Sequence, residues 1–209
     1  MIKITKSLVL ISLAAIVLDL ARLELWGTAN LFYLISNLFL AWIPYLISLL
    51  FIRKDMPLFR FIPIFIIWLL FFPNAPYLVT DVLHIASGSP AFLWYDSLIF
   101  FLFGWIGLLL GVLSLFHIHR YIKNHVNYFV SEIIVFIICL AASFGIYLGR
   151  FERWNSWDLF RSPRELVRHS TDVSSNLIHN SIPILFVLIF TIFLYLTYQT
   201  VFTLIKEET

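Results

Sequence analysis

The side chains best suited to proton transfer stand beside or within long apolar runs, and they are Asp81, His84, Asp96 and Asp158. Asp81 and His84 recur with Tyr77 at i, i+4 and i+7, which places all three on one face of a short helix. A carboxylate beside an imidazole can act as a general acid/base pair or supply two metal ligands. Because no second His/Cys cluster accompanies the pair, we expect no metal site, and a surface hydrogen bond that closes a turn is the simpler interpretation.

Asp96 stands near the start of an apolar run, where an ionisable group is costly unless it has a partner or faces water. Two interpretations stay open. An unpaired carboxyl group in that position would be protonated near neutral pH and suited to proton transfer. A carboxylate would instead be held by an ion pair with Arg150 or by a hydrogen bond from Asn37.

Arg150 and Arg153 stand at the end of another apolar run, and Trp154 and Trp157 follow them by one helical turn each. A planar guanidinium binds a carboxylate or a phosphate through two parallel hydrogen bonds. The arginines could therefore hold a lipid phosphate, although an ion pair with an aspartate is the simpler interpretation, and boundary tryptophans usually serve as anchors. We expect the polar groups of a binding site to be Asn37, Asn74, Tyr77, Arg150, Arg153, Trp154, Asn155 and Trp157.

Pro73 and Pro76 interrupt an apolar run. Because proline disfavours helical geometry in the residue before it, both preceding residues are expected to be extended and the helix to stop. Asn74 or water is expected to satisfy the carbonyl groups that the helix end leaves. A short helix can then restart at Tyr77.

The composition around these polar groups is that of a membrane protein. Of the 209 residues, 61% are hydrophobic and 12% are charged, so the lipid bilayer is the solvent. The apolar runs lack the alternation of barrel strands, which leaves helices as the spanning elements. The net charge of +2 forms no basic stripe, so nucleic acid is not an expected partner. We expect membrane lipids and an anionic amphiphilic ligand as partners, and no cofactor motif is evident.

We expect an all-α fold, a polytopic transmembrane helical bundle of about six spans. A span needs about 20 apolar residues, and the runs that qualify are residues 7–22, 31–52, 56–73, 94–116, 126–148 and 182–205. The first run resembles a signal-peptide core, but Asp19 and Arg22 stand where a cleavage motif should be, which favours an uncleaved anchor. The fifth run contains Glu132, for which Arg60 or Arg120 is the expected partner.

Between the last two spans, residues 162–165 (SPRE) have the form of a helix capping box. The apolar stripe and basic flank that follow predict an amphipathic helix over residues 163–178, lying in the headgroup plane. No repeat or flexible linker divides the chain, so we expect a single domain over residues 1–209.

The two polar segments, residues 72–81 and 145–158, must emerge on the same side of the membrane because two spans separate them. Asp96 and Asn37 should lie one to two helical turns below that surface. Every lysine falls on the opposite side together with both termini, whereas six arginines fall on the side of the polar segments, so the Lys and Arg count is eight against six. By the positive-inside rule, this favours cytoplasmic termini in the cell membrane and places the polar segments on the outer face.

Several short stretches have an unusual density of Pro, Gly, Trp and charged residues. They are residues 37–44 (NLFLAWIP), 73–77 (PNAPY) with 80–81 (TD), 94–96 (WYD), 145–150 (GIYLGR) and 153–158 (RWNSWD). These stretches resemble the bacterial membrane family called domain of unknown function 1361, over roughly residues 31–202. The resemblance implies a multi-span helical membrane protein, and it brings no established activity or catalytic residue.

Different classes of function fit these residues. The first is a membrane-embedded enzyme or binding site for a lipid headgroup or another anionic amphiphile, with arginines holding phosphate and the aspartates or His84 moving protons. No metalloprotease or nucleophile-elbow motif supports an enzyme. The second is a small transporter or channel subunit, although the polar residues do not continue through the midplane. The third is a non-catalytic assembly factor.

Overall fold

The structure is a computed structural model, and it describes residues 2–26, 32–52, 56–87, 93–154, 164, 168 and 181–207. Its elements are α1 (Ile2–Trp26), α2 (Phe32–Ser48), the 3-10 helix η1 (Leu49–Ile52), α3 (Leu58–Phe71), α4 (Asn74–Thr80), the 3-10 helix η2 (Asp81–Ser87), α5 (Leu93–Lys123), α6 (Tyr128–Phe151) and α9 (Ser181–Glu207). These ranges contain helices and no strand, so the all-α prediction is confirmed. The amphipathic helix expected over residues 163–178 lies outside them, except for positions 164 and 168.

Six helices in these ranges are long and apolar enough to cross a membrane, which confirms the multi-pass architecture. Several helices continue past the apolar run that predicted them. The extreme case is α5, whose 31 residues span about 47 Å at 1.5 Å per residue, against a hydrocarbon core of roughly 30 Å. Its last turn, with Arg120 and Lys123, therefore reaches headgroup level unless the helix tilts.

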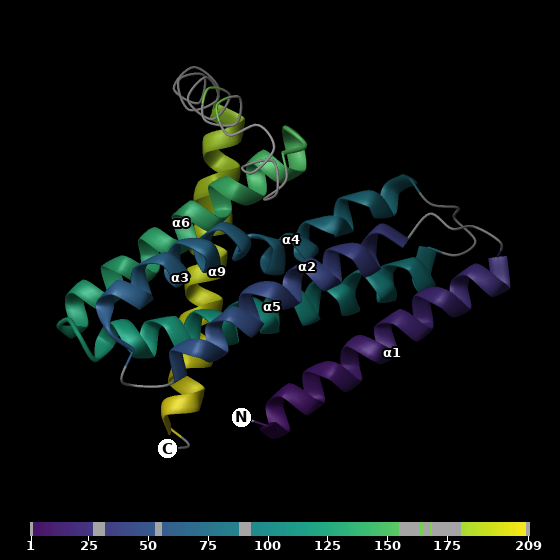
Figure 1. The fold of residues 1–209 in the computed structure, drawn as a ribbon. Helices are drawn as coiled ribbons and strands as arrows, with labels where there is room; N and C mark the ends of the chain where they lie inside the picture. The colour runs from purple at the N-terminus through teal and green to yellow at the C-terminus, as the bar shows by residue number, and fades with distance from the viewer. Residues whose placement is uncertain are drawn as a thin grey trace.

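The centre of the bundle is α5, which packs against α1, α2, α4, α6 and α9 (Figure 1). Gly104, Gly107 and Gly111 lie on its face toward α4, and a Cβ on Gly107 would collide with the carbonyl oxygen of Ala75. Small residues at a helix interface let two backbones approach closely. This close approach fixes α4, and with it the polar residues that follow, against the middle of the molecule.

The junction between α3 and α4 is helical, which contradicts the extended geometry predicted there. Phe72 has φ −55° and ψ −40°, Pro73 has φ −57° and ψ −28°, and Ala75 lies inside α4. α4 begins at Asn74, before the predicted restart at Tyr77. The prolines stand at the cap and in the first turn of α4, where backbone N–H groups have no partner inside the helix, so neither proline removes a hydrogen bond.

Asn74 satisfies a carbonyl group that the end of α3 leaves, as predicted. Its Nδ2 atom donates a hydrogen bond to the carbonyl oxygen of Phe71 at 2.9 Å. Beyond Thr80 the helix tightens into η2, which carries Asp81 and His84. A helix cap and a tight 3-10 turn therefore set the position of the polar side chains.

The two chain ends lie on the same side of the bundle, as an even number of spans requires (Figure 1). At the other side, the end of α6 meets α4. A Cβ on Gly149 would lie 3.3 Å from the Tyr77 ring and 3.3 Å from the carbonyl oxygen of Trp154. The two polar segments therefore converge, as the number of crossings between them predicted.

Candidate functional site

Arg150, in the last turn of α6, organises the polar face of the bundle. Its Nε and Nη2 atoms donate hydrogen bonds to Oγ1 of Thr80 at 2.9 and 2.8 Å. Nη2 also donates to Oδ1 of Asp81 at 2.5 Å, and Nη1 donates to Nε2 of His84 at 2.7 Å. The guanidinium lies 4.3 Å from the centre of the Tyr77 ring, which adds a cation–π contact. Tyr77, Asp81 and His84 thus share one face, as their spacing predicted.

Asp81 is only 1% exposed and is satisfied on both oxygens. Oδ1 accepts the hydrogen bond from Arg150, and Oδ2 accepts one from Nδ2 of Asn37 at 3.2 Å. A buried charge requires this kind of pairing. Arg150 bridges Asp81 and His84, and within the described ranges no group of three or more His, Cys, Asp or Glu side chains could hold a metal ion.

Asp96 forms a two-point ion pair with Arg22, and the prediction of Arg150 or Asn37 as its partner was wrong. Nε of Arg22 lies 2.5 Å from Oδ1, and Nη2 lies 2.8 Å from Oδ2. Both side chains are buried. The physical reason is that α1 brings Arg22 beside the first turn of α5, whereas Arg150 and Asn37 are both engaged by Asp81.

A cavity of about 410 Å³ opens between α2, α3, α4 and α6. Its polar lining consists of Asn37, Asn74, Tyr77 and Trp154, which the sequence predicted as binding residues. The Tyr77 ring links the cavity to the polar face, because Arg150 stacks on that ring. Four of the eight predicted binding residues therefore line one cavity, and they come from α2, from α4 and from the segment after α6.

The lining of this cavity changes from apolar to polar along the helices. On α3 and α4 it runs from Ile66 to Asn74, and on α6 from Ala141 to Gly149. Eight residues of helix rise about 12 Å. The polar end lies at the face that carries Arg150, and Ile66 at the apolar end is 59% exposed. The cavity is therefore accessible from the side of the bundle that faces lipid.

Gly145 and Gly149 shape the α6 wall of the cavity. A Cβ on Gly145 would lie 2.9 Å from Cγ of Pro73, and one on Gly149 would lie 3.3 Å from the Tyr77 ring. Glycines one turn apart let the proline-containing segment approach α6. Residues 145–150 thus supply both the cavity wall and Arg150.

Arg153 lies just beyond α6, is exposed, and has a left-handed backbone with φ 59°. This conformation costs a residue other than glycine about 1 kcal/mol. It turns the chain so that the N–H of Trp154 donates to the carbonyl oxygen of Leu148 at 3.1 Å, with Trp154 lining the cavity. The remaining predicted site residues, Asn155, Trp157 and Asp158, lie outside the described ranges.

Arg22 and Thr80 carry polar interactions of this face that the prediction did not assign. Thr80 accepts hydrogen bonds from two nitrogens of Arg150, and Arg22 neutralises Asp96. A signal for Arg22 was present in the sequence, because an arginine inside an apolar run requires an anionic partner. Thr80 offered no signal beyond its position next to Asp81.

Glu132 lies near the start of α6 and is held by neighbouring helices. Its Oε2 accepts a hydrogen bond from Gln199 of α9, and its Oε1 lies 3.7 Å from Nε2 of His119 of α5. Arg60 and Arg120, the predicted partners, are both exposed, so that prediction was wrong. Long cationic side chains extend toward water, whereas the packing of α6 on α9 encloses Glu132.

A family model described as a protein of unknown function (DUF1361) matches residues 36–197. The match covers well over half of the chain, and the chain therefore belongs to this family. The matched range includes every residue that lines the cavity, whereas Arg22 of α1 lies outside it. Comparison with curated proteins and with solved structures found no match.

Proposed function

We propose that this member of the DUF1361 family binds a single membrane amphiphile in the cavity between α2, α3, α4 and α6. The polar group of the ligand lies against Asn37, Asn74, Tyr77 and Trp154, and its chain lies along the apolar walls. One observation carries the proposal: the lining changes from apolar to polar toward the membrane face, as an amphiphile in a bilayer does.

The size of the cavity supports a partly enclosed ligand. A volume of about 410 Å³ falls within the range of small-molecule sites, roughly 300–1,000 Å³. The cavity therefore takes the polar group and the first part of a chain. The rest of the chain extends past the exposed Ile66 into the bilayer.

The polar end of the cavity offers hydrogen bonds, and its charges are already compensated. Arg150 is paired with Asp81, and Arg22 is paired with Asp96. A hydroxylated or amide-bearing polar group is therefore the best fit. An anionic headgroup, which the sequence suggested, would depend mainly on Arg153, exposed next to Trp154.

Binding fits these contacts better than transport or catalysis does. Asp81 and Asp96 accept hydrogen bonds from arginines in buried ion pairs, which is a positioning role. Along α5, Asp96 lies near one end and His117 and His119 near the other. The stretch between them is apolar apart from small residues, so α5 provides no polar path across the membrane.

A cavity-filling substitution with a matched control tests the proposal. Ala141 and Leu140 are adjacent exposed residues of α6, and only Ala141 lines the cavity. Each chain would be purified from native membranes, and the retained amphiphiles extracted and quantified. We expect wild type and Leu140→Trp to retain about one equivalent of an enriched amphiphile. Ala141→Trp should retain at least about tenfold less of the same amphiphile. Equal retention by both variants would contradict binding in this cavity.

A further inference from the structure

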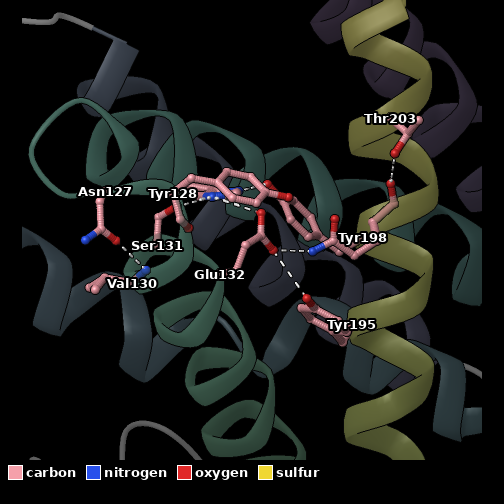
Figure 2. A network of polar contacts seen from close by, with 10 residues as sticks. Asn127, Tyr128, Val130, Ser131, Glu132, Tyr195, Tyr198 and Thr203 are labelled. Atoms are coloured by element: carbon pink, nitrogen blue, oxygen red, sulfur yellow. Dashed lines mark hydrogen bonds and ion pairs between the residues drawn. The ribbon is translucent and has the colours of Figure 1, made fainter.

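A second buried polar network lies where α5, α6 and α9 meet (Figure 2). It includes Glu132 of α6, His119 of α5 and Tyr195 and Tyr198 of α9. His119 stands at the end of α5 far from Asp96, so this network is separate from the ligand cavity. Figure 2 shows the carboxylate of Glu132 directed toward α9.

Glu132 is an enclosed carboxylate whose hydrogen-bond donors are neutral. Oε2 accepts hydrogen bonds from Nε2 of Gln199 and, at 3.3 Å, from the hydroxyl of Tyr195. Oε1 is buried and has no hydrogen-bond partner among the residues that the structure describes. A carboxylate in apolar surroundings is costly unless a positive charge accompanies it.

His119 is placed to supply that charge. Its side chain is fully buried, and Nε2 lies 3.7 Å from Oε1 of Glu132. The same nitrogen lies 3.3 Å from Oγ of Ser131, while Nδ1 lies 2.5 Å from the hydroxyl of Tyr198. Each ring nitrogen therefore has a partner. The charge of the imidazole ring depends on whether one or both of these nitrogens carry a hydrogen.

The hydrogen bonds of Ser131 and Tyr198 determine which ring nitrogen of His119 carries the hydrogen when the ring is neutral. Ser131 donates its single hydroxyl hydrogen to the carbonyl oxygen of Tyr128 at 2.7 Å, so Nε2 of His119 must donate to Ser131. In the neutral ring, Nδ1 then accepts from the Tyr198 hydroxyl. A second proton on the ring turns Nδ1 into a donor and Tyr198 into an acceptor. The Tyr198 hydroxyl is therefore a donor to the neutral His119 ring and an acceptor from the charged ring.

We propose that Glu132 and His119 together form a binding site for one proton. Without that proton, the pair is a carboxylate and a neutral imidazole. With it, the pair is a carboxylate and an imidazolium of no net charge. Nε2–H still donates to Ser131, Nε2 stays at an ion-pair distance of 3.7 Å from Oε1 of Glu132, and Nδ1–H donates to Tyr198. The proton comes from solvent, and no other bond forms or breaks.

The other titratable groups around the pair come from all three helices, and they are Lys123 of α5, Tyr128 and Cys139 of α6, and Tyr195 and Tyr198 of α9. Among these, Lys123 alone carries a charge at neutral pH. Its Nζ lies 5.2 Å from the centre of the Tyr128 ring and 5.4 Å from that of Phe202. Lys123 thus contacts aromatic rings, and His119 remains the cationic partner of Glu132.

Nuclear magnetic resonance of the full chain in nanodiscs of uncharged lipid tests the proposal. Histidine is labelled with ¹⁵N and glutamate with ¹³C, and the sample is titrated between about pH 9 and about pH 4, which brackets the ordinary values of both groups. We expect one proton to bind to the pair in wild type. Glu132→Gln should lower the proton affinity of His119 at least about tenfold, since it removes the balancing charge.

Matched substitutions separate the pair from its surroundings. His119→Gln assigns the resonance. His125→Gln in the exposed turn after α5 and Glu152→Gln at the C-cap of α6 should leave the titration unchanged. The wild-type titration alone shows whether the Glu132–His119 pair binds one proton, even if Glu132→Gln fails to fold. An ionised Glu132 beside a neutral His119 throughout would overturn the proposal. So would a titration midpoint that follows the Na⁺ or K⁺ concentration, because the site would then bind a metal cation.

Discussion

Arg150 shows how a cation is retained inside an apolar bundle. Its side chain is 7% exposed, and its hydrogen bonds and its ring contact go to side chains of α4 and η2. The planar fork reaches Thr80, Asp81 and His84 at once, which the point charge of a lysine could not do. The residue is therefore both a neutralising partner and the clamp that holds the cavity wall.

Removal of this cation should destabilise the fold strongly. Arg150→Met leaves the buried carboxyl group of Asp81 without its cation, and we expect a loss of about 3–5 kcal/mol in the free energy of unfolding. Arg153→Met removes an exposed cation three residues away and should cost less than about 0.5 kcal/mol. Unfolding titrations in mixed micelles measure both. Equal losses in the two variants would show that Arg150 is not the clamp.

The sequence predicted the shared face of Tyr77, Asp81 and His84, because this face follows from helical spacing. It did not predict Arg22 as the partner of Asp96. That pairing depends on the rotation of α1 about its own axis, and α1 has apolar residues on all sides, so no periodic stripe fixed the rotation. An ion pair between two spans depends on how the helices pack against each other, and the spacing of residues within one helix does not predict that packing.

At the scale of elements, the contact between α4 and α5 positions the site. α4 has only seven residues and could not be stable alone. Its stability comes from burial of Ala75 and Leu78 against the glycine face of α5. The sequence indicated the proline break but not this docking. The expectation of extended geometry also failed, because proline is readily accommodated at a helix start.

A methyl group at the closest point of this contact should disturb it. A Cβ on Gly107 collides with the backbone of Ala75, whereas one on Gly111 lies 3.4 Å from Pro76, an ordinary contact. Gly107→Ala should therefore cost about 1–3 kcal/mol in the free energy of unfolding, and Gly111→Ala much less. Thermal unfolding in detergent compares the two variants. A Gly107→Ala variant as stable as Gly111→Ala would contradict the close approach of the helices.

For the whole molecule, the ion-paired side chains of the described residues gather at the two ends of the bundle, and apolar packing with a few small hydrogen-bonded side chains fills the space between them. One end carries Arg22, Asp81, Asp96 and Arg150, and the other carries His119 and Glu132. This division is consistent with the proposed binding of a ligand near one end of the bundle. We propose that the end with both termini is cytoplasmic, following the position of the lysines.

Reporters fused to the chain test the topology. α9 is long and apolar enough to cross the membrane between Ser181 and its C-terminal end. A reporter fused after Ser181 and another fused after Thr209 should therefore give opposite signals, with the second on the cytoplasmic side. Matching signals at the two positions would contradict the six-span fold, and reversed signals would contradict the proposed orientation.

Under the proposed function, the cavity selects one kind of amphiphile from the bilayer. A photoreactive diazirine side chain would be placed at Leu69, which lines the cavity, and separately at Leu185, an exposed residue of α9. After irradiation in native membranes, mass spectrometry identifies the lipids attached at each position. We expect one enriched lipid class at Leu69 and the bulk lipid distribution at Leu185. The bulk distribution at both positions would overturn selective binding in the cavity.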